Sequence, residues 1–100
     1  MTSLKLTVSD AATAAGLEAD ILTTIYKKLE EYDYKPSAVE SADADATVRH
    51  LEPKGTVWFR QVDNTVDVKL HNVDVDKKDL FTAVLADLEQ RNDGLAGEID

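Results

Sequence analysis

The sequence is short of the residues that cross-link or interrupt a chain. Its 100 residues include no cysteine, four glycines and two prolines. Without cysteine the chain can form neither a disulfide framework nor a thiolate metal site, which fits a reducing compartment. The hydrophobic content of 43% is ordinary for a globular protein. The length and composition therefore predict one small domain with a modest core, which we place at residues 1–94.

Long hydrophobic runs are also lacking. No apolar run approaches the roughly 18 residues of a membrane span, and the N-terminus does not place a basic segment before an apolar one. We therefore expect no membrane association and no secretory signal peptide. The expected location is the cytoplasm or an assembled particle.

Positive charge is scarce. Eleven Lys and Arg residues face twenty Asp and Glu residues, which gives a net charge of -9. Proteins that bind nucleic acid rely on Lys and Arg to release counterions from phosphates. The phosphate backbone of a nucleic acid should therefore repel this acidic chain on average. We expect a protein partner or self-assembly instead. The acidic surface is interpreted as solubilising, with an acidic docking surface or a mimic of nucleic acid as alternatives.

The clearest structural signal is a β-hairpin over residues 56–71. Both segments, 56–62 and 65–71, are rich in β-branched and aromatic residues, and Asp63-Asn64 between them suits a two-residue turn. One face of the hairpin should be buried, because a slip of one residue would turn its apolar set outward. That face comprises Val57, Phe59, Val66, Val68 and Leu70.

The opposite face of this hairpin is the candidate site for a partner. The register places Arg60 across from Asp67, and Trp58 across from Lys69. Each cross-strand contact is worth roughly 0.2–1 kcal/mol. Trp and Arg are the usual anchors of protein interfaces, so Trp58, Arg60, Asp67 and Lys69 are the predicted partner-binding residues. The alternative is that the chain's own N-terminal helix covers Trp58.

Two main helices are predicted, at about 9–33 and 77–92. Asp76 is the predicted N-cap of the second helix, with Asp79 in the acidic place of a capping box. This helix should cover the apolar face of the hairpin. The first helix contains Gly16, which marks either a kink or a turn between two shorter helices.

The remaining segments complete an α+β fold. Short strands are predicted at 3–8 and 47–52, and residues 36–46 are interpreted as a loop because they lack periodicity. The acidic tail 95–100 should be frayed. The expected fold is an antiparallel sheet of three to four short strands, with the 56–71 hairpin central, packed against the two main helices.

Two local resemblances suggest functions. The opening helical region resembles the compact helix-turn-helix of excisionase-type regulators and of the N-terminal module of bacterial initiation factor two, through Val8, Ala11, Ala12, Ala15, Gly16, Leu17, Ile21, Leu22 and Ile25. This resemblance implies a regulator of the helix-turn-helix or winged-helix kind. The hairpin followed by a helix is similar to small head-tail joining proteins of tailed phages, which implies an assembly role.

No motif in the chain carries catalytic chemistry. His50 and His71 have no Ser or Cys arrangement beside them that would form a nucleophile and its base. The acidic sets Asp74, Asp76, Asp79 and Asp43, Asp45 lack the central Gly and closing Glu of an EF-hand. We expect no catalytic residue, no cofactor and no metal. The predicted function is a non-enzymatic protein-interaction module, an adaptor or assembly subunit of a larger complex, including a phage structural protein. The alternatives are a helix-turn-helix regulator or an acidic inhibitor of a nucleic-acid site.

Overall fold

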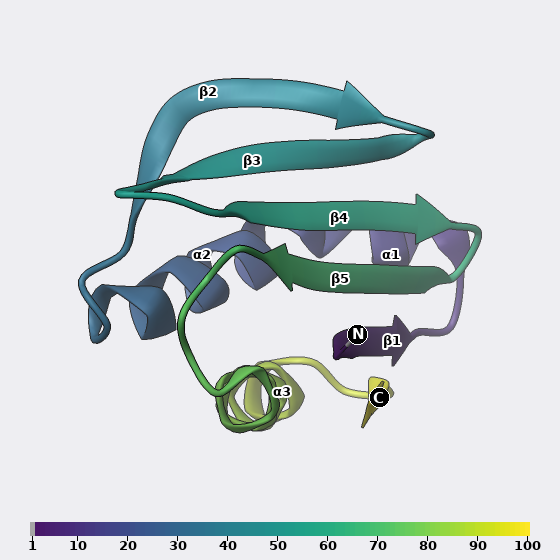
Figure 1. The fold of residues 1–100 in the computed structure, drawn as a ribbon. Helices are drawn as coiled ribbons and strands as arrows, with labels where there is room; N and C mark the ends of the chain where they lie inside the picture. Colours follow the sequence, from purple (N-terminus) through teal and green to yellow (C-terminus); the bar gives the residue numbers. More distant parts are fainter. Residues whose placement is uncertain (1) are drawn as a thin grey trace.

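The computed structural model describes residues 2–100, which form a six-stranded antiparallel sheet with helices packed on one face (Figure 1). The strands lie in the order β2-β3-β4-β5-β1-β6. The predicted α+β class is confirmed, but the predicted number of three to four strands is wrong. In chain order the elements are β1 (Ser3–Thr7), α1 (Ala11–Gly16), α2 (Glu18–Glu30), β2 (Lys35–Asp43), β3 (Ala46–Glu52), β4 (Thr56–Val62), β5 (Thr65–His71), α3 (Lys77–Arg91) and β6 (Ala96–Ile99).

The predicted hairpin is confirmed as β4 and β5. Its two-residue turn places Val62 opposite Thr65, so every predicted pair occurs, including Trp58 with Lys69. Asp63, the first turn residue, has a φ of 52°, a left-handed conformation that Asp tolerates better than most residues. The five apolar residues predicted for one face are all buried, and they belong to a single core cluster.

Strand β2 replaces the predicted loop at 36–46. Eight of its nine residues are exposed, so the strand has no buried face and no alternation of apolar and polar residues. The turn to β3 is formed by Ala44 and Asp45, with φ values of 45° and 69°. Asn-Gly is the usual sequence for such a turn, so the Ala-Asp pair gave no hairpin signal.

Strand β6 lies where a frayed tail was predicted. Ala96–Ile99 pairs with β1, and the amide of Asp100 donates to the carbonyl of Ser3 at 3.0 Å. Gly97 sits tightly beneath α3, since a Cβ atom there would lie 2.3 Å from a methyl carbon of Leu85. The strand is short and almost wholly exposed, which explains why its sequence carries no periodic signal.

The helices differ in detail from those predicted. The first is divided at Gly16 and Leu17 into α1 and α2, so the predicted helix at 9–33 is two elements. Helix α3 begins as predicted, because the Asp76 side chain accepts from the Asp79 amide at 3.1 Å. Its nearest backbone neighbours are α2, β1 and β6, and its buried side chains share one core cluster with the apolar face of the hairpin, which α1 also contacts.

The core lies between the helices and one face of the sheet. Side chains from all three helices and from β1, β3, β4 and β5 form one buried cluster. Its largest fully buried residues include Phe81 of α3, Ile21 and Ile25 of α2, and Leu4 and Leu6 of β1. Because side chains alternate along a strand, the neighbours of these core residues in the sheet point to the face that no helix covers.

Candidate functional site

The uncovered sheet face carries all four predicted partner-binding residues. Trp58 lies between Val57 and Phe59, which are buried under the helices, so its ring projects from the opposite face. The alternative that the N-terminal helix covers Trp58 is therefore wrong. We define the Trp58 patch as Val48, Trp58, Arg60, Asp67 and Lys69, which lie on neighbouring strands β3, β4 and β5.

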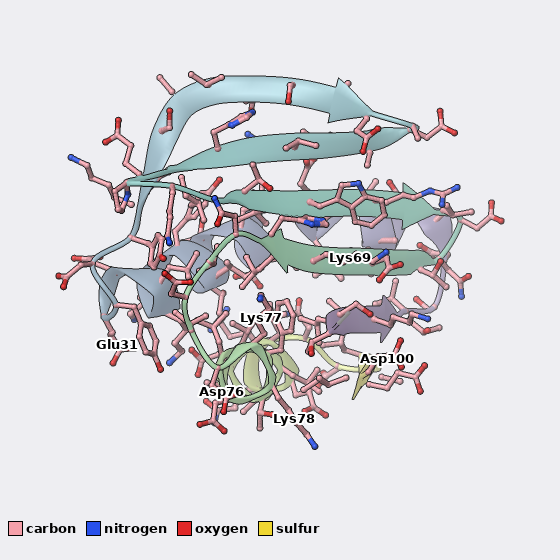
Figure 2. All side chains as sticks on the ribbon, viewed as in Figure 1. Glu31, Lys69, Asp76, Lys77, Lys78 and Asp100 are labelled. Carbon is pink, nitrogen blue, oxygen red and sulfur yellow. The ribbon has the colours of Figure 1, made fainter. Side chains whose placement is uncertain are left out.

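The Trp58 ring is held from two sides. Val48 is its partner on β3, and Lys69 is its partner on β5. The ammonium nitrogen of Lys69 lies 4.6 Å from the ring centroid, within the range of a cation–π contact. Figure 2 shows Lys69 on the face of β5 that is turned away from α1 and α2. The ring is half-buried by these neighbours and remains partly open to a partner.

Opposite charges alternate beside the ring. Asp67 is paired in register with Arg60 on β4 and with Lys5 on β1. Its Oδ1 atom is enclosed and accepts no hydrogen bond within residues 2–100. The pKa of Lys5 is raised by a hydrogen bond with Asp100, and then by the charges of Asp100 and Asp67. Asp67 therefore lies between the register positions of two basic residues, of which Arg60 is exposed at the edge of the patch.

Both histidines lie on the same sheet face. Thr56 is the register partner of His50 on β3 and of His71 on β5, so it separates the two rings. The Nε2 atom of His50 lies 3.2 Å from the hydroxyl oxygen of Ser41 on β2. This pair was not predicted from the sequence, because residues 36–46 were interpreted as a loop. A serine nucleophile needs a base that a third group orients, and within residues 2–100 no carboxylate hydrogen-bonds His50.

Two of the acidic residues considered as cation ligands have other roles. Asp76 caps α3, and Asp74 forms a salt bridge with Lys54 at 2.6 Å. Hydrogen bonding to Lys54, and then its charge, lowers the pKa of the Asp74 carboxyl. Among residues 2–100, no three His, Cys, Asp or Glu side chains are grouped as metal ligands would be.

A groove of about 580 Å³ lies between α2 and the start of β2. Tyr34 at its base is buried, and its hydroxyl accepts from the Asp74 amide at 3.0 Å. Burial raises the pKa of the Tyr26 phenol. An apolar side chain of a partner would fit against these rings. The groove is lined by Thr23, Tyr26, Lys27, Glu30, Tyr34, Lys35 and Pro36.

Comparison of the chain with protein-family models, curated proteins and solved structures found no match. Within the described residues, none of the helices has the length and apolar character needed to cross a membrane.

Proposed function

We propose that the chain is a non-enzymatic protein-interaction module whose Trp58 patch binds a partner protein. The observation that carries the proposal is a half-buried Trp on an uncovered sheet face, fixed by Lys69 and beside an exposed Arg60. Trp and Arg side chains supply a large share of the binding energy in protein interfaces. A ring that is already fixed loses less conformational entropy when a partner binds, which favours this residue as an anchor.

The role of an adaptor or assembly subunit is the form of this function that we favour. The domain is small, and it offers a sheet face and the β2 edge of the sheet, which no other element of residues 2–100 covers. A module with several open surfaces can join more than one neighbour in a complex. Phage joining proteins are one class of complex component that this proposal includes.

The alternative regulator receives less support from the geometry. In a helix-turn-helix, the start of the second helix meets the bases of DNA. Here α2 begins with Glu18 and Asp20, and both carboxylates contact cations of the same domain. Glu18 lies 3.4 Å from Arg49, and Asp20 lies 2.9 Å from Arg91. These residues tie α2 to the sheet and to α3, which favours a structural role for the start of the helix over contact with DNA.

The proposed interface can be tested by comparing two aromatic substitutions. Trp58→Ala removes the anchor, and Tyr32→Ala removes an aromatic side chain that is 47% exposed but lies away from the sheet face. Each variant would be used as bait in cells of the source organism, and candidate partners would then be purified and titrated against both. We expect Trp58→Ala to weaken binding by about tenfold or more, and Tyr32→Ala to leave it unchanged. Equal binding by both variants would contradict the proposal.

A further inference from the structure

Strand β2 forms an open edge of the sheet. It stands at one end of the strand order and pairs only with β3, and Figure 1 shows no element beyond it. Along an edge strand, alternate backbone N–H and C=O groups have no partner in the sheet. Such an edge can accept an extended segment of another protein as an additional strand.

The turn geometry identifies the free backbone groups. Ala44 and Asp45 both have positive φ, as in a type I′ turn, so the flanking pair Asp43 and Ala46 is hydrogen-bonded. Bonded and non-bonded pairs alternate along an antiparallel ladder. The N–H and C=O groups of Glu40 and Ala42 therefore point away from β3, toward the open edge.

The first half of β2 is unsuited to accepting a strand. Pro36 has no N–H group, and the pairing with β3 shifts register between Pro36 and Glu40. Within this irregular part, the amide of Val39 donates to the hydroxyl of Ser37 at 3.2 Å. Proline and bulges are features that limit pairing at sheet edges. The regular segment 40–43 is what remains available.

The charge around this segment selects its occupant. Glu40, Asp43 and Asp45 are acidic, and residues 40–45 contain no base. Glu40 contacts Arg49, whereas Asp43 and Asp45 form no salt bridge within residues 2–100. Opposite charges across a strand pair are stabilising and like charges are destabilising. A second copy of this edge would place acidic residues against acidic residues, in a chain of net charge -9.

We propose that the open edge at residues 40–43 binds an extended basic segment of another protein as an additional antiparallel or parallel strand. The free groups of Glu40 and Ala42 would supply the backbone hydrogen bonds, and Asp43 and Asp45 would attract Lys or Arg side chains. This site is distinct from the Trp58 patch, because it uses the backbone edge of β2 and requires no contact with Trp58.

A model peptide tests the edge directly. A labelled peptide of about eight residues in which Lys alternates with Val has the length of an ordinary strand. Its affinity would be measured by fluorescence anisotropy, beside a peptide in which Glu replaces Lys. We expect the Lys peptide to bind at least about tenfold more tightly, with the amide signals of Glu40 and Ala42 shifting in NMR spectra. Ala42→Pro removes one outward N–H and should weaken binding about tenfold, whereas Ala42→Val keeps the N–H and should bind as the natural chain does.

Two controls keep the result decisive. Thermal unfolding reports whether Ala42→Pro is folded, and a Lys peptide methylated at alternate backbone nitrogens removes the same hydrogen bonds without altering the protein. Equal affinity for the Lys and Glu peptides would overturn the charge selection. Binding that survives both Ala42→Pro and peptide methylation would place the peptide elsewhere. A dimer in sedimentation that Ala42→Pro abolishes would assign the edge to a second copy and overturn the proposal.

Discussion

The ammonium nitrogen of Lys69 lies 4.6 Å from the centroid of the Trp58 ring, across the ladder between β4 and β5. The two residues are register partners on the uncovered face, so the Lys side chain and the indole lie side by side above the sheet. A contact of this kind at an exposed site stabilises a fold by about 0.5–1 kcal/mol.

This contact should appear as a coupling energy between the two side chains. Trp58→Leu, Lys69→Met and the double variant would be compared by urea unfolding, which gives the free energy of unfolding of each. We expect the losses of unfolding free energy in the two single variants, added together, to exceed the loss in the double variant by about 0.5–1 kcal/mol. Lys69→Arg is the control, because Arg also interacts with aromatic faces and should retain the coupling. Additive losses would show that the ring is held by packing alone.

Gly55 should be much less tolerant of substitution than Gly94. Both have positive φ, of 95° and 76°, so Ala would be strained at either position. Open space surrounds Gly94, whereas a Cβ at Gly55 would lie 2.8 Å from the carbonyl oxygen of Asn72 and 2.7 Å from a methyl of Val73. We expect Gly94→Ala to cost about 1–2 kcal/mol, and Gly55→Ala at least about 1 kcal/mol more. Equal losses of unfolding free energy would refute this packing.

The Lys54–Asp74 salt bridge predicts a small dependence of stability on pH. The folded-state pKa of Asp74 is lowered, chiefly by its hydrogen bond with Lys54. A lowered carboxyl pKa stabilises the fold above the unfolded-state pKa, and this contribution is lost as the pH falls through the folded-state pKa. The effect should be small because both side chains are exposed.

An NMR titration of the Asp74 carboxyl carbon measures this shift. In Lys54→Met the carboxyl loses its partner, so we expect its pKa to rise toward the ordinary value of about 3.9. Lys78→Met is the matched control, because it removes a Lys near α3's start that forms no salt bridge within residues 2–100. Identical Asp74 titrations in the natural chain and in Lys54→Met would contradict the assignment.

The hairpin could be predicted residue by residue, because its two strands alternate buried and open positions around a short polar turn. Strand β2 could not be predicted, because two signals of a strand are missing from its sequence. Neither of its faces is buried, and Ala44 occupies a left-handed turn position that usually carries Asn or Gly. Strand β6 has only four residues, and its position depends on long-range pairing with β1.

The difference between local and long-range strand pairing also explains which parts of the candidate sites could be predicted. The pairing of Trp58 with Lys69 follows from the register of one hairpin, so local sequence was sufficient for it, whereas the contribution of Val48 depends on β3. The Ser41–His50 contact, the groove beside Tyr26 and the open edge at Ala42 all depend on the path of β2. Residues far from one another in sequence come together there, and the composition of the segment does not predict the course of β2.

Most basic side chains are paired with acids of the same domain, and this pairing should weaken any affinity for nucleic acid. Six of the eleven Lys and Arg side chains form salt bridges within residues 2–100. They are Lys5, Lys28, Lys35, Arg49, Lys54 and Arg91. Figure 2 shows Lys77 and Lys78 at the start of α3 with Asp76 beside them. The other adjacent Lys pair is Lys27 and Lys28, of which Lys28 forms a salt bridge with Asp87. Both pairs are therefore accompanied by acids.

We expect no complex between this protein and random duplex DNA at about 150 mM salt, where non-specific binders show dissociation constants of roughly 10⁻⁴–10⁻⁶ M. Affinity for a duplex rests on Lys and Arg that displace counterions, and Lys28 is already paired with Asp87 at 3.4 Å. Fluorescence anisotropy over a range of salt concentrations is the measurement, with Lys27→Glu, Lys28→Glu as the test variant and Lys77→Glu, Lys78→Glu as its matched control. Submicromolar binding that weakens with salt, and that only the first double variant abolishes, would assign DNA recognition to α2 and replace the interaction module with a helix-turn-helix regulator.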